Sequence, residues 1–306
     1  MHRRGPQEPV RRLGQIPEVG LYLGCCEMRS FVSATILILA KESGMKPITV
    51  AVRAARAAGQ LIRRQFRQPQ DVSQKGTADI VTQVDRDAED LIVRSIRKAF
   101  PDHGFWGEEG HRLNANAECI WVIDPLDGTK NYARGIPFFC TSIALVVRGQ
   151  PVLGVIHAPL HAETFHAEKG RGTYLNRERV EFQRRPSLQQ ASVYFGLNPY
   201  RREENPQLAL PILLRLYPEL DMVRNSGSAA LSLAYVAVGR LDIAYHDRVN
   251  AWDMLAGVVL IEECGGVATD FSGGRISLSS RDVIAANTPA FHAAVLSAAQ
   301  KVIAER

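Results

Sequence analysis

The chain has 306 residues, 46% of them hydrophobic and 23% charged, which is long enough for one large domain or for two lobes. The net charge of +5 and the pI of about 9.0 fit an anionic substrate. No basic cluster is interleaved with aromatic side chains, so nucleic-acid binding is not expected as the main role. No apolar run approaches the roughly 18 residues that cross a bilayer, so no membrane association is expected.

Cysteine usage indicates a reducing compartment. The cysteines form no Cys-x-x-Cys pair, their number is odd, and three of them lie within apolar runs. We therefore expect a cytoplasmic protein whose thiols act as small core residues. The five are Cys25, Cys26, Cys119, Cys140 and Cys264.

The first 44 residues differ in composition from the rest. They contain prolines and scattered arginines around one short apolar run at 35–40. A secretory signal would need a cleaner apolar segment, and a transit peptide would avoid the glutamates found here. We expect residues 1–44 to be an extension, disordered or not native, upstream of a natural start at Met45. A compact domain then spans 45–306.

Two helices open that domain. Apolar residues spaced by three and four predict a helix over 47–66 with a proline in its first turn. A second helical pattern covers 84–99, is entered through Thr82 and ends before Pro101. Between the two, the polar segment 70–76 is expected to be a hairpin or a loop.

The rest of the chain predicts layers of sheets and helices. Short strand-like runs broken by Pro and Gly indicate a largely antiparallel, mixed sheet in the first half. Helical and strand patterns alternate in the second half, so we expect an α/β (α+β) layered sandwich with lobes of 45–185 and 186–306. The predicted strands are 104–107, 119–123, 141–147, 152–157, 164–167, 241–245, 266–269 and 283–285, and the later helices are 206–217, 228–238, 250–263 and 289–304.

The most informative motif is the hexapeptide Asp-Pro-Leu-Asp-Gly-Thr that runs from Asp124 to Thr129. It follows an apolar run typical of a buried strand, so Asp124 and Asp127 are expected to converge where that strand ends. Two carboxylates this close would raise each other's pKa unless a cation lay between them. Oxygen ligands of this kind suit Mg²⁺ or Mn²⁺. The motif therefore predicts a metal site.

Two further acidic motifs flank it along the chain. Gly-Glu-Glu-Gly at 107–110 follows a strand-like segment, and Trp-Asp-Met-Leu-Ala-Gly at 252–257 opens a helix. Each motif alone has an ordinary structural explanation as a solvated loop, a turn or a helix cap. Their combination in this order points to chemistry instead.

The three motifs together resemble the inositol monophosphatase family of lithium-sensitive, magnesium-dependent phosphatases. The resemblance extends from residue 46 to about residue 303, and bacterial members look especially similar around 74–85 and 226–239. It implies a phosphatase domain over 45–306 with the alternating αβαβα layers of fructose-1,6-bisphosphatase-like proteins. It also implies a homodimer, which is common in the family.

The resemblance assigns metal ligands residue by residue. It implies that Glu108, Asp124 and the main-chain carbonyl of Leu126 hold a first Mg²⁺. Asp124, Asp127 and Asp253 would hold a second ion. Glu108 would also reach a third, weaker site through water. Two to three Mg²⁺ ions are therefore expected, with Mn²⁺ as a substitute.

Catalytic and substrate roles follow from the same resemblance. Asp85, in the first turn of its helix, would hydrogen-bond Thr129 and orient it toward the attacking water. Glu108, Thr129 and Asp85 are thus the implied catalytic residues. The implied substrate contacts are Asp127, Gly128, Thr129, Gly227, Ser228, Ala229, His246 and Asp253, with Lys130 and Lys75 as further candidates.

Physical chemistry supports direct hydrolysis by these groups. A phosphate monoester dianion repels hydroxide, so the ester must be neutralised and the nucleophile generated locally. Bound Mg²⁺ lowers the pKa of water, aligns it and neutralises the leaving alkoxide. Glu108 and Thr129 can accept or relay the proton of the water. The N–H groups of Gly128 and Thr129 would cradle the phosphate if they open a helix, and no phosphoenzyme is expected.

Two residues depart from the pattern of inositol phosphatases. His246 stands seven residues before Asp253, where those enzymes place a Glu that contacts an inositol hydroxyl. Its imidazole could bond a hydroxyl or face solvent. Lys130 stands where they usually have Thr and resembles histidinol-phosphate and nucleotide 3′-phosphatases. It could contact a second anionic group or point outward, and Arg134 adds a further basic side chain.

We therefore predict a phosphoric monoester hydrolase that acts on inositol 1-phosphate or a related polyol or sugar phosphate and is inhibited by Li⁺. Histidinol phosphate and nucleotide 3′-phosphates are the alternative substrates. An accessory role in transcription or RNA processing, which some bacterial relatives adopt, is the alternative from another class. The basic pI is its only support here, so nucleic acid and transcription machinery are not expected as partners.

Overall fold

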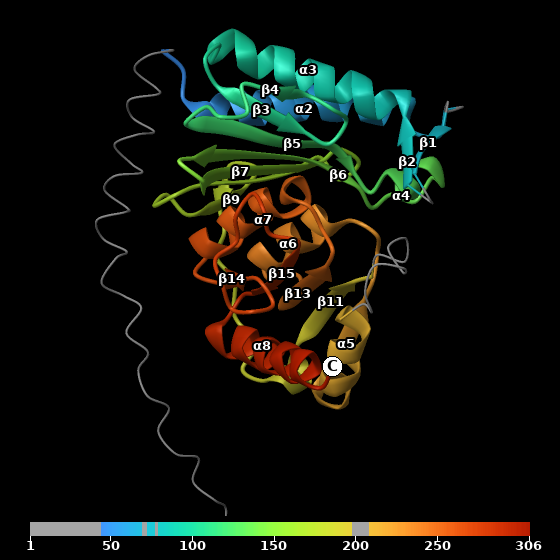
Figure 1. Ribbon diagram of the computed structural model, residues 1–306, viewed down its shortest axis with the longest axis vertical. Coiled ribbons are helices and arrows are strands. Elements are labelled where there is room, and N and C mark those ends of the chain that lie inside the picture. The colour runs from blue at the N-terminus through green and yellow to red at the C-terminus, as the bar shows by residue number, and fades with distance from the viewer. Residues whose placement is uncertain (1–43, 69–71, 77–78, 198–207) are drawn as a thin grey trace, which may run out of the picture.

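Two β-sheets and the helices around them form the layers seen in Figure 1. The computed structural model describes residues 44–68, 72–76, 79–197 and 208–306, so the extension expected over 1–44 lies outside the described residues except for its last one. The layers are a helix pair, a sheet, a second helix pair, a second sheet and a third helix pair. This confirms the predicted αβαβα sandwich. No helix in the described ranges is long and apolar enough to cross a membrane.

The outer helix pair forms where the apolar spacing predicts it. α2 spans Pro47–Gln65 and α3 spans Gln83–Ala99, and their apolar faces pack together and against the first sheet. Between them, β1 (Val72–Gly76) and β2 (Asp79–Thr82) pair antiparallel, so residues 72–76 of the segment expected to be a hairpin or a loop form one strand of a hairpin, and residues 70–71 lie outside the described residues. Since α3 begins directly after β2, the end of this hairpin determines where the first turn of α3 lies.

The first sheet has eight strands in the order β10-β9-β8-β7-β6-β5-β3-β4. All neighbours pair antiparallel except β3 and β5, as predicted for a largely antiparallel, mixed sheet. Helices cover both faces, so every residue of β5 is buried, its two aspartates included. The strands are β3 Gly104–Gly107, β4 Arg112–Leu113, β5 Cys119–Asp127, β6 Cys140–Val147, β7 Gln150–Ala158, β8 Glu163–Glu168, β9 Thr173–Leu175 and β10 Glu178–Arg179.

The second sheet has five strands in the order β12-β11-β13-β15-β14, with β11 parallel to both of its neighbours. The sequence predicts neither β11 nor β12, and the strand predicted at 241–245 is placed two residues too early. The expected break near residue 185 falls between the two sheets, but the division into lobes stays a prediction. The strands are β11 Ser192–Gly196, β12 Met222–Arg224, β13 Ile243–Asp247, β14 Val267–Thr269 and β15 Asp282–Ala286.

The remaining helices fill the middle layer and cover the second sheet. α6 and α7 lie between the sheets and are apolar almost all round, as expected for helices buried on several sides. α5 and α8 pack on the outer face of the second sheet. The predicted start of α5, residue 206, lies outside the described residues. The helix ends one residue before the predicted end, because Tyr217 begins a 3₁₀ turn. The helices are α5 Ala209–Leu216, α6 Ala229–Ala237, α7 Ala251–Glu263 and α8 Pro289–Ala304.

Candidate active site

A cavity of about 680 Å³ brings the three acidic motifs together. Its walls come from the end of β5, the short helix α4 (Thr129–Ala133), the loop before α6, and the segment that joins β13 to α7. Residues more than a hundred positions apart in the sequence therefore face one space. The lining includes Glu108, Asp124, Asp127, Thr129, Lys130, Tyr194, Gly196, Gly227, Ser228, Ala229, His246, Arg248 and Asp253.

Three carboxylates meet in this cavity. One oxygen each of Glu108, Asp124 and Asp253 lies within 4.8 Å of the other two. Asp124 is only 1% exposed, and burial raises its pKa well above the ordinary value, with further increases from Glu108, Asp127 and Asp253. A divalent cation would relieve this repulsion, and carboxylate oxygens are the donors that Mg²⁺ and Mn²⁺ prefer. The donor set therefore fits the expected metal.

The β-sheet places two of these carboxylates side by side. β3 and β5 run parallel, and Gly107 lies opposite Ile123. The residues that follow these two, Glu108 and Asp124, therefore lie side by side. The N–H of Glu108 also donates to the carbonyl of Ile123 at 3.1 Å. The prediction that the strand ends at Ile123 is wrong. β5 continues to Asp127 with an irregular register against β6, and Asp124 Oδ1 accepts a hydrogen bond from the N–H of Leu126 at 2.9 Å.

The third carboxylate is held by a helix cap. Asp253 lies in the first turn of α7, and its Oδ2 accepts a hydrogen bond from the N–H of Asn250 at 2.6 Å. Asn250 and Asp253 form a reciprocal capping box, which stabilises the start of the helix and orients the aspartate. The side chain of Asp253 thus both caps α7 and lines the cavity.

Asp127 lies beside the three carboxylates and points to the start of α6. Its Oδ2 accepts hydrogen bonds from the hydroxyl of Ser228 at 2.5 Å and from the N–H of Ala230 at 2.7 Å. Burial raises the pKa of Asp127, and these hydrogen bonds oppose the increase. The structure thereby joins the Asp-Pro-Leu-Asp-Gly-Thr motif to the segment Gly227–Ala229. The part of Asp127 in metal binding stays a prediction.

Thr129 and Asp85 form the hydrogen bond that the sequence predicts. Thr129 Oγ1 lies 3.0 Å from Asp85 Oδ1 and 3.0 Å from the carbonyl oxygen of Leu126. The other oxygen of Asp85 accepts from the N–H of Thr82 at 2.8 Å and from its hydroxyl at 2.5 Å. The sequence identifies Thr82 only as the start of a helix. In the structure it is buried and holds Asp85 in place.

Tyr194 organises the loop before α6. Its hydroxyl oxygen lies 3.0, 2.7 and 3.3 Å from the N–H groups of Ser226, Gly227 and Ser228. Three amide donors therefore share one acceptor, and the loop curves around it. Sequence reasoning missed this residue because Tyr194 stands on β11, a strand that it did not predict.

His246 is buried at the wall of the cavity, so the alternative that it faces solvent is wrong. Its Nε2 lies 2.8 Å from the hydroxyl of Ser232, which donates to the carbonyl of Ala229 at 2.7 Å. Because that hydroxyl has only one proton, Nε2 of the imidazole is the donor in the pair. Burial lowers the pKa of His246 to about 3, so the ring is neutral at neutral pH. Gly196 faces this ring, and a Cβ at that position would overlap Nδ1.

Basic side chains also line the cavity. They are those of Lys130, Arg134 and Arg248. Arg248 has a positive φ of 63° and its guanidinium lies 3.9 Å from the carboxylate of Asp247. Lys75 stands on β1, but its side chain lies outside what the structure describes. Cations and carboxylates therefore share one space, as expected for a site that binds both an anion and a metal.

The comparisons with known proteins agree with this geometry. The model of the Inositol monophosphatase family matches residues 45–304. The chain belongs to that family. The match covers both sheets and every described residue of the candidate site, so the fold and the three acidic motifs all lie within the part of the chain that matches the family.

Similar members of the inositol monophosphatase family have two kinds of name. The Nus factor SuhB of Pseudomonas aeruginosa is 40% identical over 257 residues, which cover 81% of this chain and 94% of that protein. An inositol-1-monophosphatase of Mesorhizobium japonicum is 39% identical over 262 residues, covering 85% and 98%. The solved structure of a Thermotoga maritima IMPase has a TM-score of 0.77 and 35% identity, covering 85% of this chain and 99% of that one.

Proposed function

We propose that this inositol monophosphatase family member is a Mg²⁺-dependent phosphoric monoester hydrolase. The observation that carries the proposal is the convergence of Glu108, Asp124 and Asp253 within 4.8 Å at the wall of a large cavity. A scaffold without catalytic function would have no need to gather mutually repelling carboxylates around the buried Asp124. Thr129, which donates a hydrogen bond to Asp85, lines the same cavity.

The residues expected to hold the ions are those that the sequence predicts. Glu108, Asp124 and Asp253 would bind them, with Asp127 and the main-chain carbonyl of Leu126 alongside. When bound, Mg²⁺ supplies an acidified water and neutralises charge on the phosphate and on the leaving oxygen. Two to three ions and inhibition by Li⁺ belong to this proposal.

The protein's own groups would handle the proton. Asp85 is held by two hydrogen bonds from Thr82, and its other oxygen, together with the carbonyl oxygen of Leu126, can accept a hydrogen bond from the Thr129 hydroxyl. The lone pairs of Thr129 Oγ1 are then directed away from Asp85 and can accept a hydrogen bond from the attacking water. The Glu108 carboxylate is the second candidate acceptor. Direct attack by water follows, without a covalent intermediate.

Polyol phosphates are the substrates that the rest of the cavity favours. The segment Gly227–Ala229 offers small side chains and one hydroxyl, and Ser228 is already bonded to Asp127. His246 uses Nε2 to donate to Ser232, which leaves the lone pair of Nδ1 as an acceptor for a substrate hydroxyl. We therefore propose inositol 1-phosphate or a related polyol or sugar phosphate.

A substrate with a second anionic group is the competing candidate. Lys130, Arg134 and Arg248 line the cavity that contains the three carboxylates. Such cations would neutralise an additional phosphate or carboxylate, as a nucleotide 3′-phosphate would present. Histidinol phosphate remains the other alternative that Lys130 suggests.

A panel of about ten phosphate monoesters would rank these candidates. Phosphate release is measured with Mg²⁺ for the wild type and for His246→Glu. We expect polyol phosphates to rank first and the variant to shift preference toward inositol 1-phosphate, because a Glu would restore the acceptor that inositol phosphatases have there. A shift away from inositol 1-phosphate would contradict the role proposed for His246. A wild type that releases phosphate from none of the esters would contradict the enzymatic proposal.

The relatives named Nus factor SuhB support a second candidate function, an accessory role in transcription. This function and hydrolysis are compatible in one molecule. A pull-down with Mg²⁺ that compares the wild type with Asp124→Asn would test it. Capture of transcription proteins by both forms would establish a scaffold role independent of the metal. Capture by neither would count against it. Sedimentation of the same samples would test the homodimer that we also propose.

A further inference from the structure

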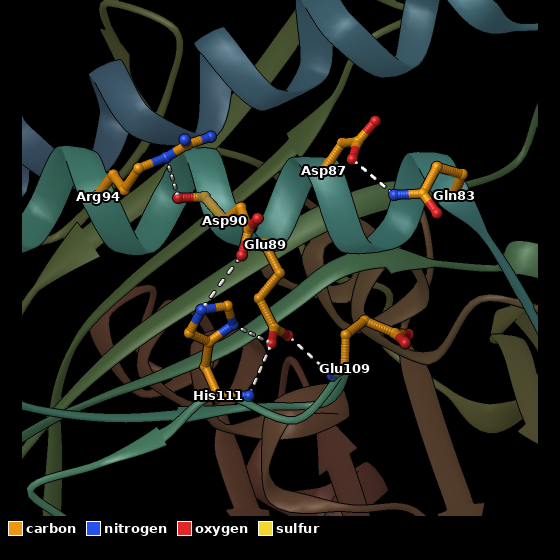
Figure 2. Close-up of polar contacts among 7 residues, drawn as sticks. All are labelled: Gln83, Asp87, Glu89, Asp90, Arg94, Glu109 and His111. Carbon is orange, nitrogen blue, oxygen red and sulfur yellow. Dashed lines mark hydrogen bonds and ion pairs between the residues drawn. The ribbon is translucent and has the colours of Figure 1, made fainter.

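A further buried carboxylate, that of Glu89, lies behind the loop that carries Glu108. Glu89 extends from the middle of α3 toward the turn that follows β3, as Figure 2 shows, and it is 0% exposed. Its Oε2 accepts a hydrogen bond from the N–H of Glu109 at 2.8 Å. Its Oε1 accepts one from the N–H of His111 at 3.0 Å and lies 2.9 Å from Nδ1 of the same residue. Glu89 does not line the cavity, so it cannot touch a substrate there.

These bonds fix the backbone on both sides of Glu108. The peptide before Glu108 is held because its N–H donates to Ile123 on β5. The peptide after Glu108 is held because the N–H of Glu109 donates to Glu89. The loop is closed by the N–H of Gly107, which donates to the carbonyl of His111 at 2.7 Å. With both peptide planes fixed, the Glu108 side chain has a defined starting direction.

Two neighbours are adapted to this arrangement. A Cβ at position 107 would overlap the carboxylate of Glu89, so only glycine permits the close approach of the loop to α3. His111 bridges outward, because its Nε2 lies 3.2 Å from the partly exposed carboxylate of Asp90. The imidazole thus lies between the carboxylates of Glu89 and Asp90, as Figure 2 shows. A carboxylate in such a place is costly unless hydrogen bonds compensate, and here the loop provides them.

We infer that Glu89 is a positioning residue for metal binding. It holds the turn 107–111 so that Glu108 already lies near Asp124 and Asp253 before a cation arrives. This rests on the proposed function in one respect, namely that Glu108 is a metal ligand. Partners that orient a ligand in this way contribute to metal affinity without touching the ion.

Glu89→Gln tests the inference with little change of shape. Each oxygen of Glu89 accepts from a backbone N–H, so an amide NH₂ in either position would face another donor. The full-length protein is titrated calorimetrically with Mn²⁺ alone, without substrate. We expect the Kd for Mn²⁺ to rise by about 10- to 100-fold, while kcat at saturating metal falls much less.

Asp87→Asn is the matched control. It removes the same charge from the same helix, but Asp87 is partly exposed, and its hydrogen-bond partner in Figure 2 is the side chain of Gln83. Its Kd for Mn²⁺ should stay within about twofold of the wild-type value, since exposed charges contribute little. An unchanged Kd in folded Glu89→Gln would overturn the inference, as would an equal loss in both variants.

Hydrogen exchange of the metal-free wild type keeps the inference testable if Glu89→Gln does not fold. The amides of Glu109 and His111 should be protected although they lie in a turn. Exchange at the rate of an unstructured peptide would overturn the inference. Phosphate release is measured separately. If the wild type releases no phosphate and Glu89→Gln lowers the affinity for Mn²⁺, the proposed function is refuted and the positioning role is supported.

Discussion

The hydroxyl of Thr129 lies 3.0 Å from Oδ1 of Asp85, a residue 44 positions earlier in the chain. This contact ties the first turn of α3 to the segment that carries Asp124 and Asp127. An ionised Asp85 and the carbonyl oxygen of Leu126 can only accept, so the Thr129 hydroxyl directs its proton toward these two oxygens. The orientation of the Thr129 hydroxyl therefore depends on both α3 and β5.

Removal of that hydroxyl should slow the reaction. Thr129→Val keeps the size of the side chain, and we expect kcat for inositol 1-phosphate to fall by about 10²-fold or more. Thr129→Ser restores the hydroxyl and should retain most of the activity. Thermal unfolding of both variants checks that the fold is intact. If the valine variant turns over as fast as the serine variant, Thr129 does not take part in proton transfer.

The hydroxyl of Tyr194 should matter for stability and for substrate binding. Tyr194→Phe leaves the three N–H groups of Ser226, Gly227 and Ser228 without their acceptor. The free energy of unfolding should fall by about 1–3 kcal/mol, and KM should rise because the loop lines the cavity. Urea unfolding and steady-state kinetics measure the two effects.

Tyr217→Phe is the control for that experiment. Tyr217 is 63% exposed, so its stability should change by less than about 0.5 kcal/mol. Equal stability of the two tyrosine variants would mean that water satisfies the loop amides as well as Tyr194 does.

Buried neutral histidines should make the protein acid-sensitive. Burial lowers the pKa of His157 to about 4, and the unfolded chain has its ordinary value of 6.5. Between these values the unfolded state binds more protons, so this residue stabilises the fold fully above pH 6.5 and its contribution is lost as the pH falls toward 4. The loss amounts to about 3 kcal/mol at most.

His157→Gln should therefore flatten the dependence of unfolding free energy on pH between 6.5 and 4. The comparison uses the slopes of variant and wild type, so lost packing at a single pH does not affect it. The buried carboxylates act in the opposite direction, because their raised pKa values favour proton binding by the folded state. These carboxylates are present in both proteins, so their effect cancels when the two slopes are compared. Identical slopes would show that His157 is not a titrating group in the unfolding reaction.

Much of the fold follows from local signals, and the missed parts have physical reasons. The outer helices carry apolar stripes at helical spacing, and the central strands are long apolar runs, so both could be predicted. β11 and β12 have only five and three residues. Runs so short lack a clear alternation, and β11 pairs with β12 and β13, which lie about 30 and 50 residues further along the sequence.

The site shows the same division between local and distant information. The acidic motifs stand out because several functional residues are adjacent in each, and the family resemblance joins them. Tyr194, Thr82 and Glu89 act singly from separate elements, and their partners are mostly backbone N–H groups. A backbone donor leaves no trace in the sequence, so these residues could be recognised only once the chain was folded.

The most direct test of the proposed metal-dependent hydrolysis is phosphate release from inositol 1-phosphate with Mg²⁺ by the wild type and by Asp124→Asn. Asp124 is the most buried of the three carboxylates, so its loss should lower kcat on the order of 10³-fold. Without metal, the variant should be at least as stable as the wild type, because a repelling buried charge is gone. Wild-type turnover by folded Asp124→Asn would contradict the proposal.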